Sequence, residues 1–397
     1  MRITGIIAEY DPFHKGHAAH IAATRRDGGA THVVSVISGS FTQRGEPAAF
    51  TKFQRTAMAL AGGADLVLEL PILWSMASAE RFAAGGVALL NGLGCVDGLS
   101  FGSECGNIDR LQRLAAASVT TEFKTALREA LDTGITYAAA QEIAYTTVTN
   151  AEDASLLASP NNTLGLEYIR AASAQGANFN YFTLARQGAL HNENAAKSGF
   201  ASGSLLRELL RRDKIDTVQE YVPQAVFDIL QQAISNGEAP VDNQKLELSL
   251  LSRLRTMTAE QLTQLPYLSE GLDNRLCKAI RSATSYEELV EGVKTKRYPL
   301  SRIRRVLWAA MVGMTAADCA GLPPYIRVLG MNERGREILS AASPTLPLLT
   351  RAAQFNELDG RARRVFELEC AATDLTALAL PRPKPCGSDY TYKLLSV

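Results

Sequence analysis

Short apolar runs alternate with helical patterns through the first 100 residues, and this alternation restricts the possible folds more than any other feature. Apolar strands that alternate with helices form a parallel sheet covered on both faces, so the sequence predicts a Rossmann-like α/β domain. The predicted strands are residues 3–8, 32–37, 65–70 and 96–101, and the predicted helices are residues 16–25, 52–61 and 75–90.

Beyond residue 108 the pattern changes to long helical segments rich in Ala, Leu, Glu and Arg. A polar loop at 159–163, a further strand at 180–184 and a helix at 202–212 interrupt or close this stretch. Past residue 215 the periodicity is mostly helical. We therefore expect two parts: an α/β domain over residues 1–212, and a mainly helical region over residues 213–397.

The composition indicates a globular cytosolic protein. Of the 397 residues, 46% are hydrophobic, which is enough to bury a large core. No run of about 18 apolar residues predicts a membrane span, and the apolar stretch at the N-terminus is too short for a signal peptide. The six cysteines lack C-x-x-C spacing, so they are expected to be reduced thiols, and no metal site is expected. The zero net charge argues against a non-specific nucleic-acid coat but allows a local basic site.

The segment YDPFHKGH (10–17) lies where the first strand ends and the first helix begins. His14 and His17 are three residues apart, so both rings point to one side of the opening helical turn. Gly16 lets the backbone approach a phosphate, and the helix N-terminus adds unpaired N–H groups and partial positive charge. With Lys15 nearby, these groups predict a cradle for a polyphosphate. The alternative is that the two histidines only cap the helix.

A second element, ASGSLLR (201–207), follows a strand and opens a helix. Ser202 or Ser204 can cap that helix, while Arg207 can project from its first turn toward a phosphate. The alternative is an ordinary serine cap beside a surface arginine.

These two elements together resemble the nucleotidyltransferase superfamily that includes the class I aminoacyl-tRNA synthetases. More specifically, the chain resembles the bacterial tRNA(Met) cytidine acetate ligase family. The chain departs from the family pattern at Asp11 and Ser40, where Asn is expected, and at Thr51, where Asp is expected. The matching segments are GIIAEYDPFHKGHAAH (5–20), SGSFTQRGEPAAFTKFQR (38–55), GADLVLELP (63–71), LSFGSE (99–104), SPNNTLGLEY (159–168) and ASGSLLR (201–207).

The resemblance implies that residues 1–212 form a nucleotidyltransferase-like ATP-binding catalytic domain and that residues 213–397 form a tRNA-binding region. It also implies a reaction in two steps. Acetate would attack the α-phosphorus of ATP and release pyrophosphate, and the wobble cytidine of elongator tRNA(Met) would then take the acetyl group on N4. Acetate needs no general base because it is already anionic at neutral pH. Magnesium is expected because ATP chemistry usually requires it.

The resemblance also implies a set of site residues, with His14 and His17 as the catalytic pair. It leaves open which of the two neighbouring asparagines contacts the nucleotide. The implied ATP contacts are Ile7, Ala8, Glu9, Tyr10, Asp11, Pro12, Phe13, His14, Lys15, Gly16, His17, Ala18, Ala19, His20, Gly102, Asn161, Asn162 and Arg186.

Basic residues supply candidates for contact with tRNA. Arg44, Lys52 and Arg55 follow the second strand and could meet RNA or pyrophosphate, or could form a solvated surface. A basic stripe with Tyr298 and Trp308 fits phosphate contacts plus base stacking, although Trp308 could instead belong to the core. The stripe consists of Lys296, Arg297, Arg302, Arg304 and Arg305.

Two other functions share some of these features. An adenylyltransferase acting on a small phosphorylated cofactor precursor would use the same histidine cradle, but it would need only one compact domain. An RNA-binding relative without catalysis would not need to retain both histidines and Arg207.

Overall fold

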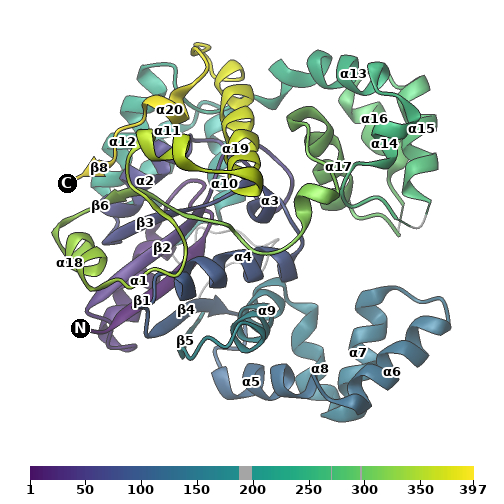
Figure 1. Ribbon diagram of the computed structural model, residues 1–397, viewed down its shortest axis with the longest axis horizontal. Helices are drawn as coiled ribbons and strands as arrows, with labels where there is room; N and C mark the ends of the chain where they lie inside the picture. Colours follow the sequence, from purple (N-terminus) through teal and green to yellow (C-terminus); the bar gives the residue numbers. More distant parts are fainter. Residues whose placement is uncertain (187–198, 270, 296) are drawn as a thin grey trace.

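One mixed sheet organises the molecule (Figure 1). The computed structural model describes residues 1–186, 199–269, 271–295 and 297–397. The strand order is β5-β4-β1-β2-β3-β6-β7, with β8 beside β6. β1 to β5 are parallel, and β6 runs antiparallel to β3. The strands are β1 (Ile3–Ala8), β2 (His32–Ser38), β3 (Leu66–Leu70), β4 (Gly98–Ser103), β5 (Asn180–Ala185), β6 (Ile326–Met331), β7 (Leu348–Leu349) and β8 (Leu395–Ser396).

Helices cover both faces of the sheet, as its apolar strands require. In β2, Val33 and Ile37 enter one apolar core, whereas Val34 and Val36 enter the other, because successive side chains point to opposite faces. The predicted α/β fold class is therefore confirmed. The first core is closed by α1 (Lys15–Arg26), α2 (Lys52–Ala61), α10 (Gly203–Arg211), α11 (Ile215–Gln219) and α12 (Gln224–Ser235), and the second by α3 (Ile72–Ser75), α4 (Ala79–Gly92) and α9 (Pro160–Ala174).

Two helical units extend from this centre, to the right of the sheet in Figure 1. The second unit has an apolar core of its own. No helix among the described residues is long and apolar enough to cross a bilayer. The first unit consists of α5 (Ile108–Ala117), α6 (Thr121–Asp132), α7 (Tyr137–Val148) and α8 (Ala151–Ser155), and the second of α13 (Glu247–Thr256), α14 (Ala259–Thr263), α15 (Leu272–Ser282), α16 (Tyr286–Val293) and α17 (Leu300–Val312).

The C-terminal part of the chain returns to the sheet, so the predicted boundary at residue 212 does not coincide with the fold. β6, β7 and β8 are strands of the same sheet as β1. Leu329 of β6 shares an apolar core with Ile6 of β1. The region that carries its own core is the α13–α17 unit, whereas the final segments complete the N-terminal domain. Those segments include α18 (Glu333–Ala341), α19 (Gly360–Leu378) and α20 (Ser388–Thr391).

A buried cluster of charges joins these returning segments to the sheet. The Lys52 ammonium of α2 lies 2.5 Å from Glu69 of β3, 2.7 Å from Asp389 and 3.2 Å from Glu369. The Arg327 guanidinium of β6 contacts Glu69 and Asp389 at 2.9 and 2.5 Å. Burial alone would lower the pKa of Lys52, but the three carboxylates raise it above its ordinary value. These ion pairs hold α19 and α20 against α2.

Replacing Lys52 tests this linkage. In Lys52→Met the three carboxylates lose a buried cation, so we expect the free energy of unfolding to fall by about 3–5 kcal/mol. Urea unfolding followed by circular dichroism measures the change. Lys278→Met is the matched control, because Lys278 lies exposed on α15 and should leave the midpoint unaltered. An unchanged midpoint in Lys52→Met would show that the cluster does not stabilise the fold.

Candidate functional site

Five segments converge at the carboxyl edge of the sheet. β1 pairs with β2 on one side and with β4 on the other, so the connections from these strands diverge at this edge. In open α/β sheets such a switch point is where ligands bind. The converging segments are the β1–α1 loop, the end of β4, the start of α9, the end of β5 and the start of α10.

His14 and His17 form a reciprocal cap at the start of α1. Nδ1 of His14 accepts a hydrogen bond from the Gly16 N–H at 3.1 Å, and Nδ1 of His17 accepts one from the His14 N–H at 3.2 Å. The rings are stacked with centroids 3.7 Å apart. Because Nδ1 of each ring is an acceptor, each neutral ring carries its hydrogen on Nε2 and can donate it to a ligand. The capping role and the ligand-binding role are therefore compatible.

The three histidines of this helix are uncharged at neutral pH. Burial, together with the positive charge of Arg186, lowers the pKa of His14 to about 3. Burial lowers the pKa of His17 well below its usual value, and His14 and Arg186 add to the effect. The pKa of His20 falls to about 4 for the same reasons, and its Nε2 lies 2.8 Å from the Ser100 hydroxyl of β4. Positive charge at the site thus comes from Arg186 and the helix N-terminus.

Packing fixes the loop that carries the histidines. A Cβ at Gly16 would lie 2.9 Å from Cε1 of His14, so this position needs glycine. Tyr10 has a φ of +50°, an uncommon conformation for a bulky residue, and its ring packs against His17 with centroids 4.8 Å apart. The Lys15 ammonium donates instead to the Glu220 carbonyl at 2.6 Å on the exposed side. Lys15 is therefore not part of the predicted phosphate cradle.

Several other implied contacts are apolar. Ile7 and Phe13 are buried in the two cores, so their side chains cannot reach a ligand. Only their main-chain atoms are available for such contact. The remaining apolar members of the set, which flank the histidines, are Ala8, Pro12, Ala18 and Ala19.

The start of α10 lies against the β1–α1 loop. Ser202 caps α10 by accepting from the Leu205 N–H at 3.3 Å, and its hydroxyl lies 2.9 Å from that of Ser204. Arg207 donates to the Asp11 carbonyl at 2.6 Å and lies 3.7 Å from the Asp11 carboxylate. In this arrangement Arg207 holds the loop in place, rather than pointing freely toward a phosphate.

Arg186, which follows β5, lies across the end of β4. It donates to Oδ1 of Asn161 at 2.7 Å. A Cβ at Gly102 would approach Cγ of Arg186 to 3.3 Å, so Gly102 lets this side chain lie close to the strand. Glu104 then orients Asn161 by accepting from its amide nitrogen at 2.6 Å. These residues form one hydrogen-bonded rim beside the histidines.

The structure distinguishes the two asparagines. The Asn162 side chain is buried, accepts from the Glu104 and Cys105 N–H groups and donates to the Leu156 carbonyl. Asn161 instead faces Arg186 on the rim. Sequence reasoning missed Glu104, whose carboxylate also accepts from the main chain of both asparagines. Only the structure reveals this role, because Ser159 begins α9 without a side-chain cap and the helix needs an acceptor from elsewhere.

The contacts with RNA or pyrophosphate that were predicted for Lys52 and Arg55 are wrong, since both side chains are completely buried. Arg55 donates to the carbonyls of Glu9, Ser38, Gly39 and Phe50. Helical spacing could have revealed this, because positions 52, 55, 56 and 59 share one buried face of α2. Arg44, by contrast, is exposed.

The basic stripe is largely structural. Arg304 pairs with Glu46 at 2.6 Å, and Arg302 donates to the Tyr267 carbonyl at 3.0 Å. The Arg305 guanidinium lies over the Tyr267 ring, 5.6 Å from its centroid. The stripe thus joins α17 to the 41–47 loop and to the rest of its helical unit. Arg297 is exposed, and Lys296 lies outside the described residues.

The base stacking predicted for Tyr298 and Trp308 is also wrong, whereas the alternative that Trp308 belongs to the core is confirmed. Tyr298 and Trp308 are buried, so neither can stack on a base. Sequence reasoning missed the exposed basic face of α15, although its three-residue spacing was readable. That face carries Arg275, Lys278 and Arg281.

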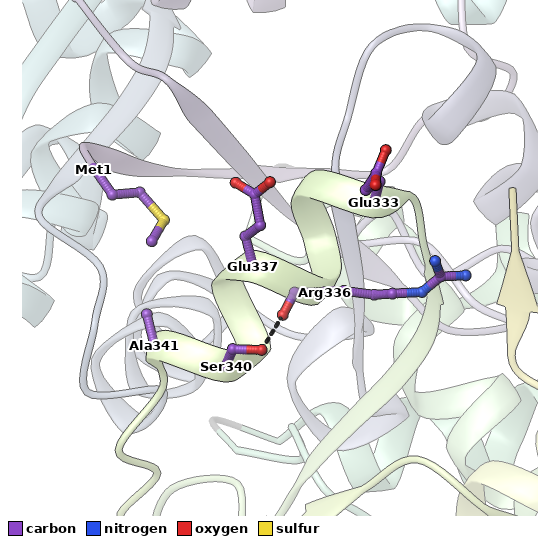
Figure 2. A pocket seen from close by; sticks show the side chains of 6 residues that line it. All are labelled: Met1, Glu333, Arg336, Glu337, Ser340 and Ala341. Atoms are coloured by element: carbon purple, nitrogen blue, oxygen red, sulfur yellow. Dashed lines mark hydrogen bonds between the residues drawn. The ribbon is translucent and has the colours of Figure 1, made fainter.

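Figure 2 shows a surface hollow beside α18 that does not belong to this site. Its Glu337 carboxylate lies 2.8 Å from Nε2 of His32, the first residue of β2. The hollow therefore opens at the amino end of the sheet, opposite the histidine cap. It is lined by Met1, Glu333, Arg336, Glu337, Ser340 and Ala341.

Comparisons with known proteins show which family the chain belongs to. A family model described as HIGH Nucleotidyl Transferase matches residues 1–389. Proteins described as tRNA(Met) cytidine acetate ligase are 37% identical in Acetivibrio thermocellus and 36% identical in a Thermoanaerobacter species, each over the whole of both chains. The crystal structure of Thermotoga maritima TmcAL bound with alpha-thio ATP matches with a TM-score of 0.92 at 32% identity, and the apo structure with 0.94, again over both whole chains. The chain thus belongs to the HIGH nucleotidyl transferases and, within them, to the tRNA(Met) cytidine acetate ligase family.

Separate substitutions of the two asparagines should have different effects. Asn161→Ala should weaken ATP binding about tenfold, the value of one neutral hydrogen bond, without changing stability. Asn162→Ala should lower the free energy of unfolding by about 2–3 kcal/mol, because buried partners are left unsatisfied. Isothermal titration calorimetry and thermal melts measure the two effects. Loss of stability in Asn161→Ala would contradict this division of roles.

Proposed function

We propose that this chain activates acetate with ATP and transfers the acetyl group to N4 of the wobble cytidine of elongator tRNA(Met). The observation that carries the proposal is the capped histidine pair, whose neutral rings present Nε2–H donors beside Arg186. The alpha-thio ATP in the TmcAL crystal supports ATP as the nucleotide, and the names of the relatives support tRNA(Met) as the acceptor of the acetyl group.

In the first step an acetate oxygen attacks the α-phosphorus and pyrophosphate leaves, which gives acetyl-adenylate. Negative charge grows on the phosphate oxygens during this displacement. Preorganised donors aimed at that charge lower the barrier, and the Nε2–H groups of His14 and His17 supply them. Arg186 adds a full positive charge. Since the histidines are neutral, their donation does not depend on protonation near neutral pH.

Magnesium belongs to the proposal as a partner of the phosphates. Among the described residues, no three His, Cys, Asp or Glu side chains surround a common metal position. Magnesium commonly keeps several water ligands and binds through substrate phosphates. The ion would therefore reach this site with ATP.

In the second step the cytidine amine takes the acetyl group and AMP leaves. We place the tRNA along the helical unit α13–α17 and the 41–47 loop. The exposed basic residues there suit phosphate contacts. They are Arg44 on the loop, Lys278 and Arg281 on α15, and Arg297 before α17.

Incubation of the protein with labelled acetate, ATP and total tRNA tests the proposal. Label in tRNA is expected, with N4-acetylcytidine as the labelled nucleoside. Transfer of AMP to a small phosphorylated cofactor precursor would instead support the adenylyltransferase alternative. Binding of RNA without any turnover would support a catalytically inactive relative.

The histidine pair provides a sharper test. His17→Ala removes one donor to the developing charge, so turnover should fall about 100-fold or more. Lys15→Ala is the matched control, since Lys15 lies in the same motif but points to Glu220, and it should retain normal turnover. Steady-state acetylation of tRNA measures both. Near-normal activity of His17→Ala would refute its role.

A further inference from the structure

The Glu9 carboxylate occupies the centre of the carboxyl edge, directly after β1. One oxygen, Oε1, accepts a hydrogen bond from the Gln43 N–H at 2.6 Å. Within the described part of the chain, no hydrogen bond engages its other oxygen, Oε2. The side chain is half-buried, so it combines a desolvated setting with access to the site.

Charged and polar groups face Glu9 from every wall of the site. Three charged side chains interact electrostatically with Glu9. They are Asp11 in the β1–α1 loop, Arg207 on α10 and Arg44 on the loop after β2. Tyr168 of α9 also interacts electrostatically with Glu9. Arg55 lies beneath the loop and donates to the Glu9 carbonyl at 2.8 Å. Tyr168 also interacts with Arg186, so the same wall serves the nucleotide rim. A ligand that bridges the histidine cap and the 41–47 loop must pass beside this carboxylate.

The second step of the proposed reaction needs a proton acceptor. The exocyclic amine of cytosine is conjugated with its ring and is a weak base. When its nitrogen bonds to the acyl carbon, the nitrogen becomes positively charged and its proton must be removed. A positioned general base typically accelerates such a step about 10²- to 10⁴-fold.

The other titratable groups around the site are already engaged. His14 and His17 use Nδ1 to accept main-chain hydrogen bonds, which leaves them as donors. Asp11 accepts from the Ala49 N–H at 2.8 Å, and its remaining oxygen is buried beside Arg207. Glu104 uses both oxygens on the main chain of α9. Glu9 retains an oxygen suited to receive a proton.

We propose that Glu9 is the general base of acetyl transfer, an inference that rests on the proposed function. The N4 nitrogen of cytidine forms a bond to the acetyl carbon, and the bond from that carbon to the phosphate oxygen of AMP breaks. The electron pair of the broken bond leaves with AMP. The proton lost from N4 passes to Oε2 of Glu9. Atoms and charge balance without any further reactant.

The electrostatic setting of Glu9 suits this role. Burial raises the pKa of its carboxyl, the Gln43 N–H and Arg207 oppose the rise, and Asp11 adds to it. A carboxylate with a raised pKa is a stronger base near neutral pH than an ordinary glutamate. The base is active when ionised, so the transfer rate should rise with pH through the pKa of Glu9 and then level off.

Measuring the two steps separately in Glu9→Gln tests the proposal. Acetate-dependent exchange of pyrophosphate into ATP should stay within about threefold of wild type, because acetate needs no base. Single-turnover transfer from acetyl-adenylate to tRNA should fall about 100-fold or more and lose its rise with pH. Glu9→Asp should recover part of the rate together with the pH dependence. Glu333→Gln, an exposed change near α18, is the control and should leave both steps normal.

Each other outcome has a distinct meaning. Unimpaired transfer in Glu9→Gln, with an active wild-type protein, would overturn the role of Glu9 and leave the proposed function standing. Equal losses in exchange and transfer would also overturn it, because Glu9 would then serve ATP or acetate binding. A wild-type protein that shows no acetate-dependent exchange would overturn the proposed function and this inference together. Should Glu9→Gln fail to fold, the pH dependence of Glu9→Asp decides instead.

Discussion

The site depends on two hydrogen bonds in which main-chain N–H groups at the start of α1 bind Nδ1 of His14 and His17. The first amides of any helix lack partners within the helix, and this helix uses two of them to orient imidazoles. Each such bond contributes only about 1 kcal/mol to stability. Its larger effect is to fix the tautomer, because a neutral ring whose Nδ1 accepts carries its hydrogen on Nε2. Burial then keeps the rings neutral, and the donors remain in place at any pH near neutrality.

The loop around those histidines is in turn supported from beneath by Arg55. Its guanidinium bridges the carbonyl of Glu9 at the end of β1 and those of Ser38 and Gly39 at the end of β2. The next support comes from the far end of the chain, because Glu369 of α19 accepts from the Ser40 N–H at 3.2 Å and pairs with Lys52. A Cβ at Gly39 would overlap the Glu369 carboxylate, so the two segments are in close contact. The C-terminal segments are therefore physically part of the domain that is built on the sheet.

These contacts explain what the sequence could and could not predict. The strands of the parallel sheet and the His14–His17 cap were predictable because their signals are local: β-branched runs, helical periodicity and a motif at a strand–helix junction. The ion pairs of Lys52 with Glu369 and Asp389 were not predictable, since these two partners lie more than 300 residues away along the chain. β6 was missed because its residues are surrounded by helical patterns, and only pairing with β3 identifies it as a strand. The two asparagines are adjacent and chemically identical, so only the fold could separate the buried Asn162 from Asn161 on the rim.

The short segment 43–46 connects Glu9, the proposed base, with α17, which belongs to the helical unit where we place the tRNA. Gln43 binds the Glu9 carboxylate through its N–H, and Glu46, three residues later, pairs with Arg304 of α17. Between them Gly45 has a φ of +75° and lies so close to the main chain of Arg305 that any side chain would collide with it. Three extended residues span at most about 11 Å, and this segment is a turn closed by the Thr42–Glu46 hydrogen bond, so it has little slack. A displacement of α17 relative to the sheet must therefore either break the Glu46–Arg304 ion pair or move the group that holds Glu9.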